Sequence, residues 1–170
     1  MYGDNFSMIV IGIDPGVETG FAAIRDGNLF LYSKQLMHQI KGISILETFP
    51  QDNQIIHLYI ESQYLNRTSK KTNFITLRKL IEIEGYWKYE AIKNKINQIH
   101  EVLPNVWQSR MLSSSKLKRN ELKKLSVQRV NKEWKESIKN HNLADAINIA
   151  NYGWIEEQIK IKSVKNHENI

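Results

Sequence analysis

The sequence predicts one α/β domain in which helices cover a mixed β-sheet. Apolar runs separated by tight turns fill the first part of the chain, and such runs are typical of strands. Further along, strands alternate with segments whose apolar residues recur at three- and four-residue spacing, which is typical of helices. The 170 residues are enough for one domain with its own core, so we expect a single domain over 1–170.

A three-stranded antiparallel meander is predicted at the start of the sheet. Residues 8–14 form a run rich in Ile and Val that closes with Pro-Gly. Asp26 and Gly27 make a good two-residue hairpin turn, so the strands 20–25 and 28–35 are expected to pair across it. Parallel strands are expected to extend this meander into a mixed sheet.

The remaining elements follow from periodicity and composition. In chain order we expect a short helix over 40–49, a strand over 55–60, a helix over 72–99, a strand over 100–107 interrupted by Pro104, a basic loop over 111–120, helices over 121–138 and 143–158, and a frayed polar tail over 160–170. Gly85 in the middle of a helix costs about 1 kcal/mol relative to Ala, which indicates close packing against another element.

The composition indicates which kind of partner the protein binds and which residue types could hold a metal. The formal net charge is +6 and the pI about 9.4, which favours a polyanionic partner, although a general lysine bias would give the same charge. There is no cysteine, so a metal would be held by oxygen or histidine ligands. No apolar run approaches the ~20 residues that span a membrane, and the first ten residues lack a basic signal-peptide region.

Three carboxylates stand where a charge is unexpected. Asp14 and Glu61 each end an apolar strand, and Asp145 lies in a helix among small and apolar residues that let the helix approach a sheet closely. Burying an unpaired carboxylate costs several kcal/mol, so each must surface in a turn or meet a cation. Sites in such sheets form at the carboxyl ends of strands, where Asp14 and Glu61 could converge.

Two interpretations of these carboxylates remain open at this point. Each acid taken singly is explained as a turn or capping residue. Taken together, three carboxylates without cysteine suit hard cations such as Mg²⁺ or Mn²⁺. Two such ions could clamp the attacking and leaving oxygens of a phosphodiester.

Four motifs resemble those of a known family. "IGIDPGVETGFAAI" resembles the opening of RuvC-type Holliday-junction resolvases, "LYIESQY" their second acidic motif, "HNLADAINIA" their last motif, and "LPNVWQSRM" is similar to the segment before their basic loop. The motifs occur in the family's order between residues 8 and 158. The resemblance implies a ribonuclease H-like fold, a centre of two Mg²⁺ or Mn²⁺ ions, and Asp14, Glu61 and Asp145 as catalytic metal ligands.

One position departs from the family pattern. The family commonly has a fourth ligand, usually Asp and sometimes His, three residues before the last Asp. Asn142 occupies that position here, and His141 lies four residues before Asp145. Because residues four apart share a helix face nearly as well as residues three apart, His141 is expected to be the catalytic ligand. The alternatives are coordination through the Asn142 amide oxygen, and an exposed or capping role for His141.

Basic residues and one tyrosine are expected to contact the DNA. Phosphate contacts would position the substrate without reading its sequence. Tyr64 matches the place where the family has an aromatic wedge at the junction centre, and stacking a base there is worth ~1–3 kcal/mol. Tyr64 as a packed loop residue, and the basic clusters as solvated surface, are the alternatives. The expected phosphate-binding residues are Arg67, Lys70, Lys71, Arg110, Lys116, Lys118, Arg119, Lys123 and Lys124.

The resemblance implies an endodeoxyribonuclease of recombination and repair that nicks Holliday junctions or other branched DNA symmetrically as a homodimer. The helix 72–99 is the expected dimer interface, with Tyr86 and Trp87 as contacts or as core residues. The resemblance also implies a cytoplasmic protein of a bacterium or a phage-infected host, without a membrane partner.

Three other functions remain as alternatives to a Holliday-junction endonuclease. A sugar-kinase, actin or Hsp70-type ATPase also opens with a strand, an Asp and a Gly, but it needs two lobes, and this chain holds one domain. A non-catalytic junction-binding relative would lack metal-dependent cutting. A ribonuclease H-fold nuclease could act on RNA or on other DNA structures.

Overall fold

The computed structural model describes residues 7–36, 45–49, 54–62, 74–96, 98–113 and 117–167. Within these residues five strands form one mixed sheet in the order β3-β2-β1-β4-β5. Strands β1 to β3 pair antiparallel, whereas β4 runs parallel to β1 and β5 parallel to β4. The predicted α/β fold, with its antiparallel meander and added parallel strands, is therefore confirmed. The strands are β1 (Ser7–Asp14), β2 (Glu18–Arg25), β3 (Asn28–Leu36), β4 (Gln54–Glu61) and β5 (Gln98–Val102).

The hairpin between β2 and β3 forms at the predicted turn. Asp26 and Gly27 both adopt left-handed backbone conformations, with φ of 48° and 84°. This is the geometry of a two-residue turn whose twist matches that of the paired strands. The Asp26 side chain also accepts a hydrogen bond from the Met8 backbone N–H at 3.0 Å, which ties the turn to the start of β1.

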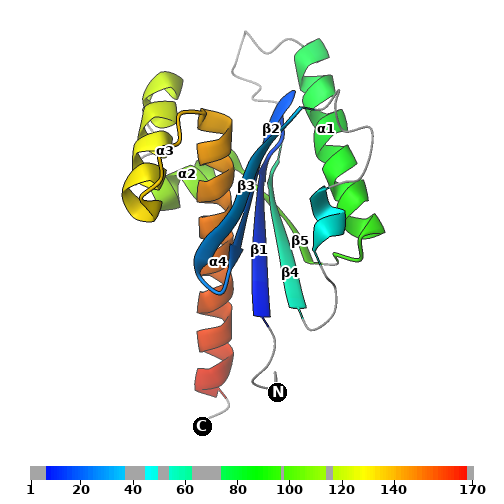
Figure 1. Cartoon of the computed structure of the whole chain (residues 1–170), viewed down its shortest axis with the longest axis vertical. Helices are drawn as coiled ribbons and strands as arrows, with labels where there is room; N and C mark the ends of the chain where they lie inside the picture. The colour runs from blue at the N-terminus through cyan, green and yellow to red at the C-terminus, as the bar shows by residue number, and fades with distance from the viewer. Residues whose placement is uncertain are drawn as a thin grey trace.

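Helices lie on both faces of the sheet (Figure 1). One face carries α1 together with the turn η2, and its core contains Ile11, Leu46 and Trp87. The other face carries α4, with α2 and α3 packed around it, and its core contains Val10 and Ile149. The elements are η2 (Ile45–Thr48), α1 (Phe74–Lys93), α2 (Pro104–Leu112), α3 (Arg119–Trp134) and α4 (His141–His167).

Two glycines allow α4 to lie directly on the sheet. A Cβ atom at Gly12 would overlap the backbone oxygen of Ala146, and one at Gly20 would overlap that of Asn142. A side chain at either position would therefore push the helix outward. This close approach brings the N-terminal end of α4, which carries Asp145, against the end of β1.

The prediction for residues 100–107 is wrong in its second half. Strand β5 ends at Val102, and Pro104 begins α2 instead of interrupting a strand. Proline fits the first turn of a helix because the N–H that it lacks has no helical partner there. Helix α2 extends to Leu112, so the loop predicted over 111–120 is also wrong at its start, and α3 already begins at Arg119.

Other predicted boundaries also need correction. Helix α1 ends at Lys93 instead of residue 99, and Lys95 has a left-handed φ of 59° that is incompatible with a continuing helix. Helix α4 begins at His141 and continues to His167, beyond the predicted end at residue 158. Gly85 does not mark close packing, because, apart from its chain neighbours and the backbone of its own helix, no atom of the described residues lies within 4 Å of a Cβ placed there.

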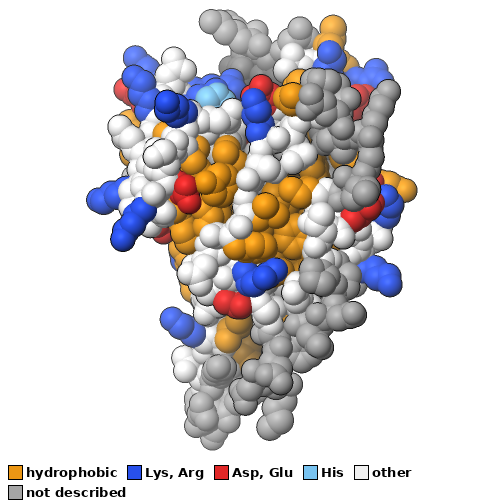
Figure 2. All heavy atoms as spheres, in the orientation of Figure 1, with side chains coloured by type: hydrophobic (Ala, Val, Ile, Leu, Met, Phe, Trp, Pro, Cys, Tyr) orange, Lys and Arg blue, Asp and Glu red, His pale blue; other side chains and the backbone are white. Residues whose placement is uncertain are grey.

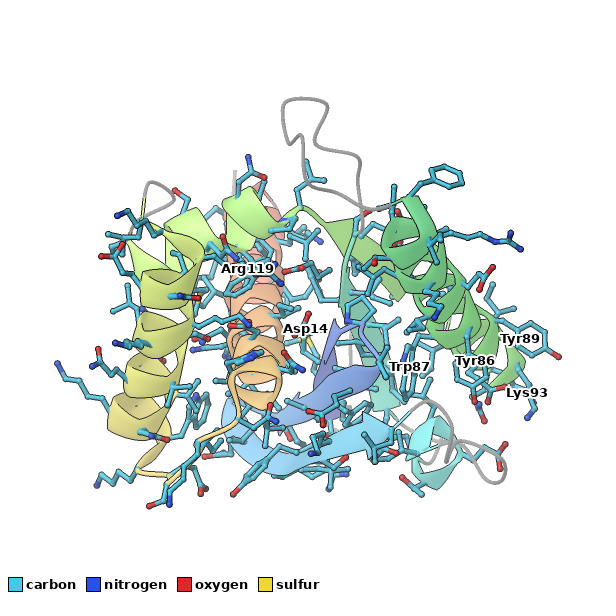
Figure 3. The ribbon with its side chains drawn as sticks, turned by 90° about the horizontal axis from the view of Figure 1, so that it is seen from above. Asp14, Tyr86, Trp87, Tyr89, Lys93 and Arg119 are labelled. Atoms are coloured by element: carbon cyan, nitrogen blue, oxygen red, sulfur yellow. The ribbon has the colours of Figure 1, made fainter. Side chains whose placement is uncertain are left out.

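Trp87 is a core residue and not an exposed interface residue. Its side chain points from α1 toward the sheet, whereas Tyr89 points away (Figure 3). The Trp87 indole N–H also donates a hydrogen bond to the hydroxyl of Thr19 at 3.3 Å. Tyr86 is partly buried against the same core. In the described part of the chain, no helix has the length and apolar character needed to cross a membrane.

Candidate active site

Asp14, Glu61 and Asp145 come together in a cleft of about 230 Å³ at the carboxyl ends of β1 and β4. Asp14 is the last residue of β1 and Glu61 the last of β4, and the parallel register sets these strand ends side by side. Asp145 reaches the cleft from the second turn of α4. The other lining residues are Pro15, Gly16, Glu18, Leu80, Gln108, Leu112, Arg119, Leu122, Lys123, His141 and Asn142.

The cleft disfavours the negative charge that its carboxylates carry. Burial raises the pKa of Asp14 well above its ordinary value, and the nearby charges of Glu61 and Asp145 raise it further. Burial likewise raises the pKa of Asp145 to about 6, although a hydrogen bond from Ser126 and the charge of Lys123 act against the rise. A divalent cation among these groups would compensate the charge, so they form a plausible ligand set for a hard metal ion.

A buried tryptophan orients Glu61. The indole N–H of Trp107 donates a hydrogen bond to Glu61 Oε2 at 2.7 Å. The Trp107 ring is fully buried between α2 and the sheet, in the same cluster as Val10 and Ile149. Its N–H is therefore held in a fixed direction, and it fixes the position of the carboxylate in turn.

A buried polar network orients Asp145. The hydroxyl of Ser126 on α3 donates to Asp145 Oδ1 at 2.5 Å. The side-chain amide of Asn148 donates to the Ser126 hydroxyl at 2.9 Å and to the backbone oxygen of Ala144 at 3.0 Å. Ser126 and Asn148 are both buried. The network therefore couples the carboxylate to the packing of α3 on α4.

His141 and Asn142 both lie at the cleft, in the first turn of α4. Asn140 caps this helix, and the Asn142 amide donates to the backbone oxygen of Glu18 at 2.9 Å. His141 Nε2 lies 2.9 Å from the ammonium of Lys123. Burial and the Lys123 charge lower the pKa of His141, which keeps the imidazole neutral. Its Nδ1 is buried without a hydrogen-bond partner in the described part of the molecule.

Some of the predicted basic residues surround the cleft. Arg119 and Lys123 line it from α3, and Lys118 and Lys124 are exposed on the same helix end. Lys and Arg side chains gather at the end of the molecule where α3 and α4 begin (Figure 2), and Figure 3 shows Arg119 there. Arg110 instead lies 3.6 Å from Glu156, outside the cleft. Tyr64, Arg67, Lys70, Lys71 and Lys116 lie outside the described residues.

Sequence reasoning missed the side chains that hold the carboxylates in place. Trp107 lies within a motif that we singled out, but nothing in the sequence pointed its N–H at Glu61. Ser126 and Asn148 are ordinary polar residues of two helices, and only the packing of these helices reveals their contact with Asp145.

Comparison with known proteins gives structural matches at low sequence identity. No protein-family model and no curated protein matches the chain. A Thermus thermophilus RuvC structure in complex with a Holliday junction substrate has a TM-score of 0.65 and 16% identity, covering 90% of this chain and 96% of that one. Another Thermus thermophilus RuvC structure has a TM-score of 0.62 and 15% identity, covering 90% and 97%. The chain therefore has the RuvC-type, ribonuclease H-like fold that its motifs predicted.

Proposed function

We propose that this chain is a metal-dependent, structure-selective endonuclease that nicks Holliday junctions or related branched DNA. One observation carries the proposal: carboxylates from β1, β4 and α4 line a single cleft whose rim is basic. Its RuvC-type fold supports the same function, since a RuvC of this fold has been solved with a junction substrate.

Asp14, Glu61 and Asp145, with His141 or Asn142, are the proposed ligands of Mg²⁺ or Mn²⁺. Bound metal would act as a Lewis acid that stabilises the charge developing on the phosphate and on the attacking water. We infer two ions from the resemblance of the three acidic motifs to those of RuvC-type resolvases, whose carboxylates line this cleft from three separate elements. Two ions about 3.5–4 Å apart suit such a set of carboxylates.

The chain's own residues would orient the metal ligands and the DNA. Trp107 and Ser126 hold Glu61 and Asp145 in fixed directions, which reduces the reorganisation needed when phosphate arrives. Arg119 and Lys123 would contact phosphate oxygens from the rim. Such contacts hold the backbone at the cleft without selecting a base sequence.

The exposed face of α1 is the proposed dimer interface. Large apolar side chains form a stripe along it at helical spacing, and Gly85 lies in the stripe without a side chain, which would allow a second helix to approach closely. A second copy of the chain would bury this stripe and hold two clefts for symmetric nicking. The stripe consists of Phe74, Ile75, Ile81, Tyr89 and Ile92.

A substitution in this stripe tests the dimer. Ile81→Glu and Ile92→Glu together should convert the protein to a monomer in sedimentation analysis, because a charge in a dry interface is costly. Lys79→Glu is the control, since it changes charge on α1 outside the stripe. A wild-type monomer at micromolar concentration would contradict the proposal.

A cleavage assay tests the proposed activity. A four-way junction with separately labelled strands is incubated with Mg²⁺, Mn²⁺ or EDTA. We expect paired nicks that require metal and that Asp14→Asn and Glu61→Gln abolish, while junction binding persists. Glu101→Gln is the matched control, because Glu101 pairs with Lys88 outside the cleft and should cut normally.

Other outcomes of this assay would support a different function or a different metal site. Junction binding without metal-dependent cutting would support a non-catalytic relative. Cutting of an RNA–DNA hybrid in preference to the junction would support another ribonuclease H-fold nuclease. Normal cutting by Asp14→Asn or Glu61→Gln would contradict the assignment of the metal site.

A further inference from the structure

Two histidines and a glutamate form a second cluster away from the cleft. His57 lies on β4, His100 on β5 and Glu157 on α4, so three separate elements each contribute one side chain. In the described part of the chain, this is the group of three acidic or histidine residues whose ligand atoms come within 4.8 Å of one another. None of the three lines the cleft that holds Asp14.

The distances within the cluster match those of a metal site. His57 Nδ1 lies 3.3 Å from His100 Nε2 and 3.5 Å from Glu157 Oε1, and His100 Nε2 lies 3.7 Å from that oxygen. The point equidistant from these three atoms is about 2.0 Å from each, which agrees with Zn–N and Zn–O bonds of about 2.0–2.2 Å. The spacing of the three atoms therefore suits a zinc ion once the two imidazole rings, whose nitrogens face each other, turn toward it.

The surrounding side chains hold the three ligands in place. The rings of His57 and His100 are stacked at 5.5 Å, and Tyr59 stacks on His100 at 4.5 Å. The Tyr59 hydroxyl donates to Glu157 Oε1 at 2.6 Å, and Lys160 donates to the same oxygen at 2.6 Å. The Tyr59 hydroxyl would help to orient Glu157 as a metal ligand, whereas the Lys160 ammonium occupies the oxygen that would bind the metal.

The protonation states also suit a metal. Burial lowers the pKa of both His57 and His100, which favours the neutral imidazoles. Burial alone would raise the pKa of Glu157, but hydrogen bonds from Lys160 and Tyr59 and the nearby His57 hold it below its ordinary value. Neutral imidazoles and a charged carboxylate are the forms that bind metal.

We propose that His57, His100 and Glu157 form a second metal site, selective for Zn²⁺ over Mg²⁺. Two imidazoles and one carboxylate are a donor set for zinc, whereas Mg²⁺ prefers oxygen ligands alone. The bound ion would connect β4, β5 and α4, and water would complete its coordination. Its role is to stabilise the packing of α4 on the edge of the sheet.

The site is distinct from the catalytic cleft. His57 and Glu61 lie on the same face of β4, and four residues of a strand separate them by about 13 Å. Glu157 and Asp145 lie twelve residues apart on α4, which corresponds to about 18 Å along the helix. A zinc ion held by His57 would thus not share ligands with the catalytic metals, and the inference stands independently of the proposed function.

Lys160 competes with a metal at this site. Its ammonium lies beside the carboxylate oxygen that would bind zinc, but the side chain is 54% exposed and can turn into solvent. The ligands themselves are better covered, with 12% of the His57 side chain and 28% of His100 exposed. An ion would therefore enter past His100, and removal of the Lys160 charge should strengthen its binding.

A zinc titration tests the proposal in a chain that lacks an affinity tag. Asp14→Asn and Asp145→Asn are combined as the background, so that the catalytic cleft does not contribute metal ligands. Calorimetry should give one Zn²⁺ per chain with micromolar or tighter affinity, and Co²⁺ should give the visible absorption bands of a tetrahedral site. Binding should weaken as pH falls, because protons compete for the imidazoles.

Variants separate this site from adventitious binding. His100→Gln should weaken zinc binding at least tenfold, whereas His141→Gln, the matched change in the cleft, should leave it unchanged. Lys160→Met should tighten binding several-fold without removing a ligand, so it remains informative if His100→Gln fails to fold. Absence of zinc binding in the background, or binding that His100→Gln leaves intact, would overturn the proposal.

Discussion

Replacing Asp145 by Asn should make the metal-free protein more stable at neutral pH. The native pKa of Asp145 is about 6, above its ordinary value of 3.8, because the carboxylate is buried. A carboxyl group whose pKa is higher in the folded than in the unfolded state adds most to the free energy of unfolding when it is protonated. This stabilising contribution is therefore lost as pH rises between about 4 and 6. Asparagine removes this loss, and its side-chain oxygen can still accept the hydrogen bond from Ser126.

The pKa sets the magnitude of this effect. A shift from 3.8 to about 6 corresponds to at most about 3 kcal/mol, and solvent screening at the cleft mouth reduces it. Nearly half of this, about 1.4 kcal/mol, should develop between pH 5 and pH 8. In a chain of this length, 1 kcal/mol corresponds to roughly 2–4 °C in melting temperature.

Urea denaturation of wild type and Asp145→Asn in EDTA, at several pH values from 5 to 8, measures the effect. His57, His100 and His141 have lowered pKa values in the folded protein. Their contributions to the free energy of unfolding therefore increase as pH rises, whereas that of Asp145 decreases. The difference between the two proteins removes the contributions of His57 and His100, which lie outside the cleft. It retains a contribution from Asp14, whose pKa the Asp145 charge raises, and this acts in the same direction as the loss of Asp145. Adding Mg²⁺ at pH 7.5 should stabilise the wild type and have little effect on the variant. A variant no more stable than wild type at pH 7.5, or a difference that does not grow with pH, would refute the reasoning.

Three further predictions concern the cleft and the DNA. Trp107→Phe keeps a ring but removes the hydrogen bond to Glu61, so the Mg²⁺ concentration for half-maximal cutting should rise about tenfold; an unchanged metal requirement would show that the bond does not position the ligand. His141→Ala should also raise the metal requirement, and Asn142→Asp in the same chain should restore it; normal cutting by His141→Ala with an inactive Asn142→Ala would assign the ligand to the amide oxygen. Tyr64→Ala should weaken binding of a four-way junction more than that of a duplex in a gel-shift assay, since only the junction offers an opened base step; equal losses would favour a packing role.

The sequence alone determined the sheet and the chain positions of its acids. The meander was predictable because Asp26-Gly27 permits a turn that few other dipeptides adopt, and because the flanking runs have strand character. Asp14 and Glu61 could be brought together in advance, since the carboxyl ends of neighbouring parallel strands meet at one edge of a sheet. These inferences depend on the backbone conformations that particular residues allow and on the pattern of apolar residues along a strand, and both can be read from the sequence.

Only the tertiary structure decided which side chains meet across elements. Trp87 could be a core or a surface residue on a helix with apolar side chains on two faces, and the packing of α1 placed it in the core. Ser126 meets Asp145 because α3 packs on α4, and Tyr59 meets Glu157 across 98 residues of sequence. Such contacts depend on where a helix lies on the sheet, which the close approach at Gly12 and Gly20 sets. Small residues in the sequence indicate that a helix can approach the sheet closely, but not where along the sheet it packs, because that position results from the packing of the whole core.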